Sequence, residues 1–181
     1  MNVSKITGFS LVEILVTIVI LMVGLLGLAG LQGFALSSQL ESYQRSQALI
    51  LLKDMENRMN ANRLNAASYQ VSMLGTGITC PVGSSLASQD LNQWCNALLG
   101  AAEAQGGVNP GAMIGARGCI TQTVAPASGV AAQYLVAVAW QGLHATKAPN
   151  ITCGSGQYGS NDDMRRVVAV PVNIADVLTL N

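Results

Sequence analysis

Charged and aromatic residues are scarce in this sequence of 181 residues, at 10% and 4% respectively, and the formal net charge is zero. A neutral chain has no long-range field that would attract nucleic acid or anionic lipid, so we expect no nucleic-acid partner. Arg165 and Arg166 form too small a basic patch for DNA binding, and we expect them to begin an exposed strand. The length suits one domain with an appendage.

The sequence also lacks the signs of a catalytic, metal or cofactor site. Its single histidine, His144, has no cysteine or carboxylate close to it in the sequence, and we interpret it as a surface-loop residue. No nucleophile-elbow, zinc-protease or phosphate-loop motif occurs. Asn161, Asp162 and Asp163 are too few oxygen ligands for calcium and predict a solvated turn. We therefore predict a protein that is not an enzyme and needs no cofactor or metal.

Cysteine is present four times, but never as a CxxC pair, and the separations along the chain are 15, 24 and 34 residues. Four-cysteine zinc sites usually use close pairs, because two ligands from one tight turn fix half of the tetrahedron. An even number of cysteines in an exported segment favours two disulfides over a metal site or free thiols. The residues concerned are Cys80, Cys95, Cys119 and Cys153.

A long apolar run lies near the N-terminus. Residues 9–31 contain one charge, that of Glu13, and residues 14–31 contain none. A helix of about 20 such residues crosses the hydrocarbon core of a membrane. Lys5 is the only charged side chain ahead of the run, so the positive-inside rule predicts a cytoplasmic N-terminus and export of the remaining chain.

Three interpretations of this run compete. A cleaved signal peptide has an apolar core of about 7–15 residues and then a small-x-small site, whereas this core is longer and contains a carboxylate. A plain membrane anchor fits the length but leaves Glu13 in lipid without a partner, at a cost of about 3 kcal/mol. A helix that polymerises with like helices would supply that partner.

The segment Lys5-Ile-Thr-Gly8-Phe9-Ser-Leu-Val-Glu13 resembles the signal of type IV prepilins, in which a short basic leader ends in glycine and a glutamate is the fifth mature residue. The resemblance implies that prepilin peptidase cleaves between Gly8 and Phe9 and methylates the new α-amine of Phe9. It also implies that Glu13 pairs with the α-amine of Phe9 in a neighbouring subunit. Two opposite charges in an apolar filament cost less when they are paired.

The helical pattern continues beyond the apolar run. Charged residues lie opposite an apolar stripe, which we assign to Leu36, Leu40, Tyr43, Ile50, Leu51, Met55 and Met59. No proline occurs before Pro81, so we predict one helix from about Phe9 to about Arg63, about 80 Å long.

Four glycines recur every third residue in this helix, at Gly24, Gly27, Gly30 and Gly33. Small residues allow neighbouring membrane helices to pack closely. Each glycine also weakens the helix by up to about 1 kcal/mol relative to alanine, so the segment could bend or unwind on assembly. Both interpretations stay open.

The chain after the long helix is rich in turn residues, above all at 81–85 and 106–111. Between these turns, residues 90–105 predict a short helix that Asp90 caps. One side of this helix should carry Leu91, Trp94, Leu98 and Leu99.

Three strands are predicted next, at residues 118–124, 134–140 and 165–172. Pro171 suits an edge strand, because proline has no N–H to donate to a neighbouring strand. The middle strand alternates and places on one face Tyr134, Val136, Val138 and Trp140. The prediction is an α+β fold, in which a long N-terminal helix packs its apolar stripe on a small antiparallel meander.

Residues 52–63, the strand end Val138-Ala-Trp140, and Cys153 followed by the pair Arg165-Arg166 resemble the heads of PilV-type minor pilins. The resemblance implies the type IV pilin fold. It divides the chain into a leader (1–8), a transmembrane and assembly half of the helix (9–36), an amphipathic half (37–66) and a periplasmic head (67–181).

The same resemblance implies a minor pilin that joins other minor pilins and the major pilin, primes or caps pilus assembly, and supports twitching motility and adhesion. A tip adhesin is a further candidate partner. The protein would enter the inner membrane with its N-terminus cytoplasmic and then reach the pilus. The alternative is an I- or J-type minor pseudopilin of type II secretion. A membrane-anchored periplasmic enzyme and a DNA-uptake receptor fit less well, since the catalytic motifs and the positive charge are missing.

Four cysteines allow three connectivities, and the sequence alone does not select one. We expect Cys80–Cys95, which would close the loop region over the short helix, and Cys119–Cys153, which would join the first strand to the long loop before the last strand. Each bond would stabilise a loop-rich head by about 2–4 kcal/mol.

Overall fold

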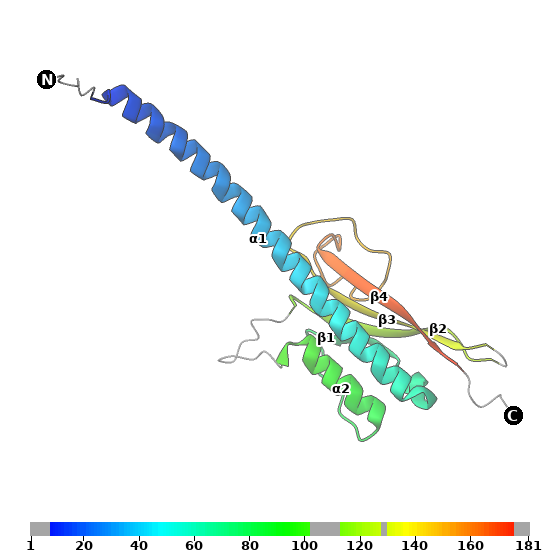
Figure 1. Ribbon diagram of the computed structural model, residues 1–181. Helices are drawn as coiled ribbons and strands as arrows, with labels where there is room; N and C mark the ends of the chain where they lie inside the picture. Colours follow the sequence, from blue (N-terminus) through cyan, green and yellow to red (C-terminus); the bar gives the residue numbers. More distant parts are fainter. Residues whose placement is uncertain (1–7, 102–112, 128–129, 176–181) are drawn as a thin grey trace. The chain divides into compact units, whose positions relative to one another are not determined.

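A computed structural model describes residues 8–101, 113–127 and 130–175 of the chain (Figure 1). It contains two compact units, Met1–Leu40 and Glu41–Asn181. Helix α1, Leu11–Ala61, runs through both units, which confirms the predicted helix to within two residues at each end. The other elements all belong to the second unit: η1 (Arg63–Tyr69), β1 (Val71–Gly75), α2 (Leu86–Leu98), β2 (Arg117–Val124), β3 (Ala132–Gln141) and β4 (Arg165–Ile174).

The stripe by which α1 packs differs from the predicted one. Met55 and Met59 are buried as expected, but large side chains assigned to the stripe are exposed, namely Leu36, Leu40, Tyr43 and Ile50. The buried positions are spaced by four, four, three and four residues: Gln44, Ala48, Leu52, Met55 and Met59. The small side chain of Ala48 allows the helix to approach its neighbours closely, and a reading based on large apolar residues misses that face.

The sheet is a four-stranded antiparallel meander in the order β1-β2-β3-β4. The three predicted strands are confirmed, and β1 was missed, because five residues with the sequence Val-Ser-Met-Leu-Gly carry little strand signal. Strands β3 and β4 pair without a register shift from Ala132↔Ile174 to Gln141↔Arg165. Pro171 lies in the edge strand, as expected.

Both faces of the sheet are covered. On one face the four predicted core residues of β3 are buried with the α1 stripe and with Trp94 of α2, and α2 lies beside the second half of α1 (Figure 1). The indole N–H of Trp94 donates to the carbonyl of Leu51 at 2.9 Å. On the other face Ala137 and Ala139 pack under the loop between β3 and β4, which contributes Tyr158.

Helix α2 begins earlier than predicted. Its N-cap is Ser85, whose hydroxyl oxygen accepts from the N–H of Ser88 at 3.2 Å. Asp90 is therefore not the cap; it lies in the second turn, where it is buried. The predicted face is confirmed for Leu91, Trp94 and Leu98. Residues 102–105 of the predicted helix and the predicted turn at 106–111 lie outside the described residues.

Two disulfides restrain the second unit. Cys80 is bonded to Cys95, and Cys119 is bonded to Cys153. These are the two pairs expected from the sequence. The first joins the loop before α2 to α2 itself, and the second joins β2 to the loop that covers the outer face of the sheet.

Candidate processing and assembly segment

The start of α1 leaves the predicted cleavage bond outside the helix. Gly8, Phe9 and Ser10 are not helical, and the carbonyl of Ser10 accepts from the N–H groups of Glu13 and Ile14 at 3.0 and 3.3 Å. The side chain of Phe9 is 80% exposed. A peptidase needs a backbone that is free of secondary structure, and the bond between Gly8 and Phe9 meets that need.

The described residues of the first unit expose mainly apolar side chains. Its helix is long and apolar enough to cross a membrane, with a mean hydropathy of 2.8 over the best window. The one hydroxyl within the apolar run beyond Glu13 is that of Thr17, and it donates to the carbonyl of Ile14 at 2.8 Å. This surface needs lipid or other helices to cover it, because the exposed apolar area greatly exceeds what a soluble monomer leaves in water.

Glu13 interrupts this apolar surface in the first turn of α1, and its side chain is exposed. Within residues 8–101, 113–127 and 130–175, no basic group lies within ion-pairing distance of Glu13. A carboxylate in this position calls for a cation from outside the described chain. The predicted partner, the α-amine of Phe9 in another subunit, has the required charge.

The glycines at 24, 27, 30 and 33 lie inside α1, which is unbroken across them. A Cβ atom added at any of the four would meet open space. No contact within the described chain therefore demands glycine at these positions.

A clamp that the sequence did not predict fixes the head to α1 just after the first unit ends. The Oε1 atom of Glu41 accepts from the N–H of Leu143 at 3.1 Å and from Nη2 of Arg166 at 3.3 Å. Burial opposes ionisation of Glu41, but these partners outweigh it and lower the pKa of the carboxyl. His144 is exposed, as predicted, and its Nδ1 is 3.8 Å from the same oxygen.

The arginine pair begins β4, as predicted, but it is not exposed. Arg165 is buried and donates to the carbonyls of Pro149, Ile151 and Cys153, while Arg166 is half-buried and donates to the carbonyl of His144. Both side chains thus hold the loop between β3 and β4.

Asp162 is also more than a solvated turn residue. Its Oδ2 accepts from the N–H of Gly156 at 2.7 Å and from the hydroxyl of Ser155 at 3.1 Å, and Arg165 lies beside it at 3.3 Å. The bond from Gly156 is the main reason that the pKa of Asp162 is lowered. In the part of the chain that the structure describes, no three acidic, histidine or cysteine side chains are placed to hold a metal.

A second polar network links α1, η1 and α2. Nη1 of Arg58 donates to Asp90 at 2.9 Å, and the hydroxyl of Tyr69 donates to the other oxygen of the same carboxylate. Burial and this bond raise the pKa of Tyr69 to about 12. The sequence contained one sign of this network: Asp90 is the only charged residue of α2, and it directly precedes the core residue Leu91.

Comparison with known proteins gives two matches, both to families. The prokaryotic N-terminal methylation motif matches residues 3–29, which include the predicted cleavage bond and Glu13. The family described as type IV pilin Tt1218 matches residues 30–97, which include the rest of α1 and all of α2 except its last residue. No curated protein and no solved structure matched the chain.

Proposed function

Because the chain is a type IV pilin-like protein, we propose that it acts as a minor pilin, a non-catalytic subunit that primes or caps pilus assembly and supports pilus-dependent motility and adhesion. Its partners are prepilin peptidase, the other minor pilins, the major pilin and, as a further candidate, a tip adhesin. No nucleic acid is needed for this role.

Glu13 carries the proposal. Glu13 is an exposed carboxylate on an apolar helix, and the proposed cleavage bond lies just before this helix. Glu13 gains a partner when cleavage makes Phe9 the N-terminus of a neighbouring subunit. The segment from Phe9 to Leu40 is then covered by like helices, and the charge pair sets their register. The four glycines would permit close approach between such helices.

The proposed route begins in the inner membrane. Residues 1–8 remain cytoplasmic, prepilin peptidase removes them and methylates Phe9, and the head folds in the periplasm, where its disulfides form. The subunit then leaves the membrane for the pilus and reaches the cell surface.

The assignment to minor rather than major pilins is supported by the head residues that resemble the PilV-type. Leu52, Met55 and Met59 share a core with Trp140. Arg165 donates to the carbonyl of Cys153 at 2.9 Å, which joins the first arginine of the basic pair to the cysteine before the last strand. The same helix-on-sheet plan also occurs in minor pseudopilins of type II secretion, so the experiment must separate the two systems.

Deletion of the gene, followed by counts of surface pili and assays of exoprotein secretion, makes this separation. We expect loss of most surface pili and of twitching, with secretion unchanged and with recovery on complementation by the wild-type gene. Normal piliation together with lost secretion would assign the chain to a secretion system instead.

A further inference from the structure

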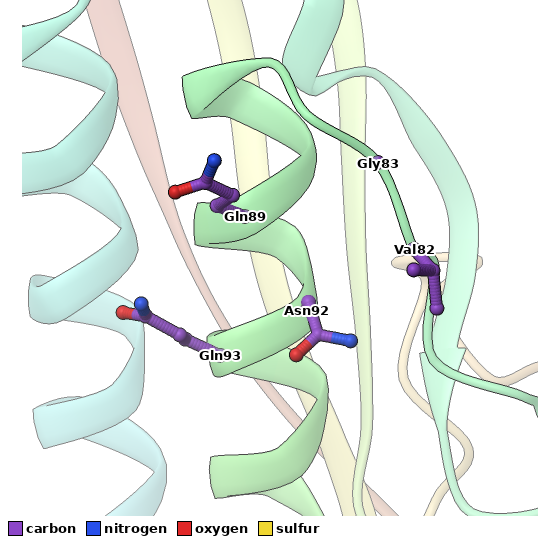
Figure 2. Close-up of a pocket in the computed structure, with 5 residues that line it drawn as sticks. All are labelled: Val82, Gly83, Gln89, Asn92 and Gln93. Carbon is purple, nitrogen blue, oxygen red and sulfur yellow. The ribbon is translucent and has the colours of Figure 1, made fainter.

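An open cavity of about 240 Å³ lies on the surface of α2, next to the loop that leads into this helix (Figure 2). It is distant in sequence from the processing segment, and the assembly role does not use it. None of the lining residues that the structure describes is charged, and four of these five are polar or glycine: Val82, Gly83, Gln89, Asn92 and Gln93.

The walls of the cavity are held in place before any ligand arrives. The amide nitrogen of Asn92 donates to the carbonyl of Pro81 at 2.8 Å, and the Cys80–Cys95 disulfide joins the same loop to the helix. The cap formed by Ser85 fixes the first turn. A ligand would therefore find an ordered surface, which reduces the entropy lost on binding.

Two glutamines present a fixed pattern of one acceptor and one donor. Nε2 of Gln89 donates to the carbonyl of Ser84 at 3.1 Å, which leaves its Oε1 as an acceptor. Oε1 of Gln93 accepts from Nη1 of Arg58 at 2.7 Å, and since a guanidinium can only donate, Nε2 of Gln93 remains as a donor. Neither remaining atom has a partner among the described residues. Both side chains project from the same side of α2, one turn apart (Figure 2).

The charge of Arg58 is not available to a ligand, because the guanidinium forms ion pairs with Asp54 and Asp90, both at 2.9 Å. An ion in the cavity would therefore lose hydration without gaining a counter-charge. A peptide would need apolar pockets for its side chains, and Val82 is the only apolar residue among the described residues of the lining.

The neighbouring hydroxyls of a sugar each donate and accept, so they match the free acceptor of Gln89 and the free donor of Gln93. We propose that the cavity is a binding site for a neutral saccharide, whose hydroxyls bond to Oε1 of Gln89 and Nε2 of Gln93. This inference is independent of the role in assembly.

The test uses the full chain in a phosphocholine detergent, since a maltoside or glucoside headgroup would compete for the site. Saturation-transfer NMR titrations with neutral hexoses and N-acetylhexosamines should give saturable binding for at least one sugar. Gln89→Ala and Gln93→Ala should each weaken this binding about tenfold or more. Gln70→Ala, which removes an exposed glutamine elsewhere on the head, should bind like the wild type.

Gln93→Ala also removes a contact of Arg58, so Gln89→Ala, which loses only the bond to Ser84, is the decisive variant. The fluorescence of buried Trp94 reports whether either variant keeps its fold. Absence of saturable binding across the panel would overturn the proposal, as would binding that is equal in wild type and Gln89→Ala. Saturable binding of tri-alanine peptide without any sugar would overturn it as well. Both variants should still support piliation, which separates this site from the assembly role.

Discussion

At the scale of single residues, Glu13 imposes the strongest condition on the molecule. Its side chain lies on an apolar helix, on which the neighbouring residues Val12, Ile14 and Val16 are exposed. In lipid such a carboxylate costs about 3 kcal/mol, and a cation beside it recovers part of that cost. The proposed cation exists only after cleavage, so processing and assembly would be coupled through one ion pair.

Glu13→Ala should therefore reach the membrane and be cleaved, yet give at least tenfold fewer pili. The matched control is Thr17→Ala, because the hydroxyl of Thr17 is already satisfied within its own helix. Immunoblots of membrane and sheared-pilus fractions measure both steps. Wild-type piliation in Glu13→Ala would remove the proposed role of this residue.

Gly8→Ala should block processing, because the peptidase is expected to require glycine before the cleaved bond. The precursor, longer than the mature chain by residues 1–8, should accumulate in the membrane and be visible by gel shift and by mass. Gly33→Ala, in open space within α1, should be processed normally. A mature-sized product from Gly8→Ala would place the cleavage site elsewhere.

Tyr69 gives the head a sensitivity to alkaline pH. Its folded pKa of about 12 lies above its ordinary value of 10.0, so the folded state holds this proton more tightly than the unfolded state. The contribution to stability is complete below pH 10 and is lost as the pH rises through the folded pKa. We expect the urea midpoint of the wild type to fall more steeply between pH 10.0 and about 12 than that of Tyr69→Phe. Parallel curves for the two proteins would contradict this.

At the scale of elements, the periodicity of the sequence predicted α1 and three strands, because each runs for eight residues or more with a consistent pattern. The periodicity did not predict which residues are buried where tertiary contacts determine burial. Asp90 looked like a cap, but Arg58 and Tyr69, both remote in sequence, make it a core residue. Likewise, the packing face of α1 includes Ala48, whose burial depends on the elements that pack against it.

The candidate site also has one part that the sequence predicted and parts that it did not. The local pattern from Gly8 to Glu13 could be recognised in the sequence, since its chemistry depends on adjacent residues. The clamp between Glu41 and Arg166 and the cavity beside α2 could not, because each joins segments whose proximity only the fold creates.

The crossing of α2 over β2 depends on one glycine. A Cβ atom at Gly118 would lie 2.3 Å from the Trp94 ring and 2.8 Å from Leu98. Gly118→Ala should thus force α2 away from the sheet and destabilise the head by about 1–3 kcal/mol. Urea denaturation followed by tryptophan fluorescence measures this. An unchanged midpoint would mean that α2 adjusts without loss, and Gly33→Ala should leave the midpoint unchanged.

At the scale of the whole molecule, the two units owe their stability to different sources. Every buried apolar residue that the structure describes lies at Ala48 or beyond, so the core belongs to the second unit alone. The first unit has no core of its own within the described residues and depends on membrane or neighbouring helices. Substitutions should accordingly separate into those that affect assembly and those that affect the stability of the head.

The Cys119–Cys153 disulfide offers the sharpest test of this separation. It closes a loop of 34 residues, and its removal in Cys119→Ser/Cys153→Ser should destabilise the head by about 3–4 kcal/mol. Membrane insertion and cleavage should continue, because both depend on residues 1–31. Glu13→Ala should show the converse, with an unchanged urea midpoint and lost assembly. If the double serine variant were not cleaved, or if Glu13→Ala lowered the midpoint, the two units would be coupled, and head folding would be part of the processing step rather than a consequence of export.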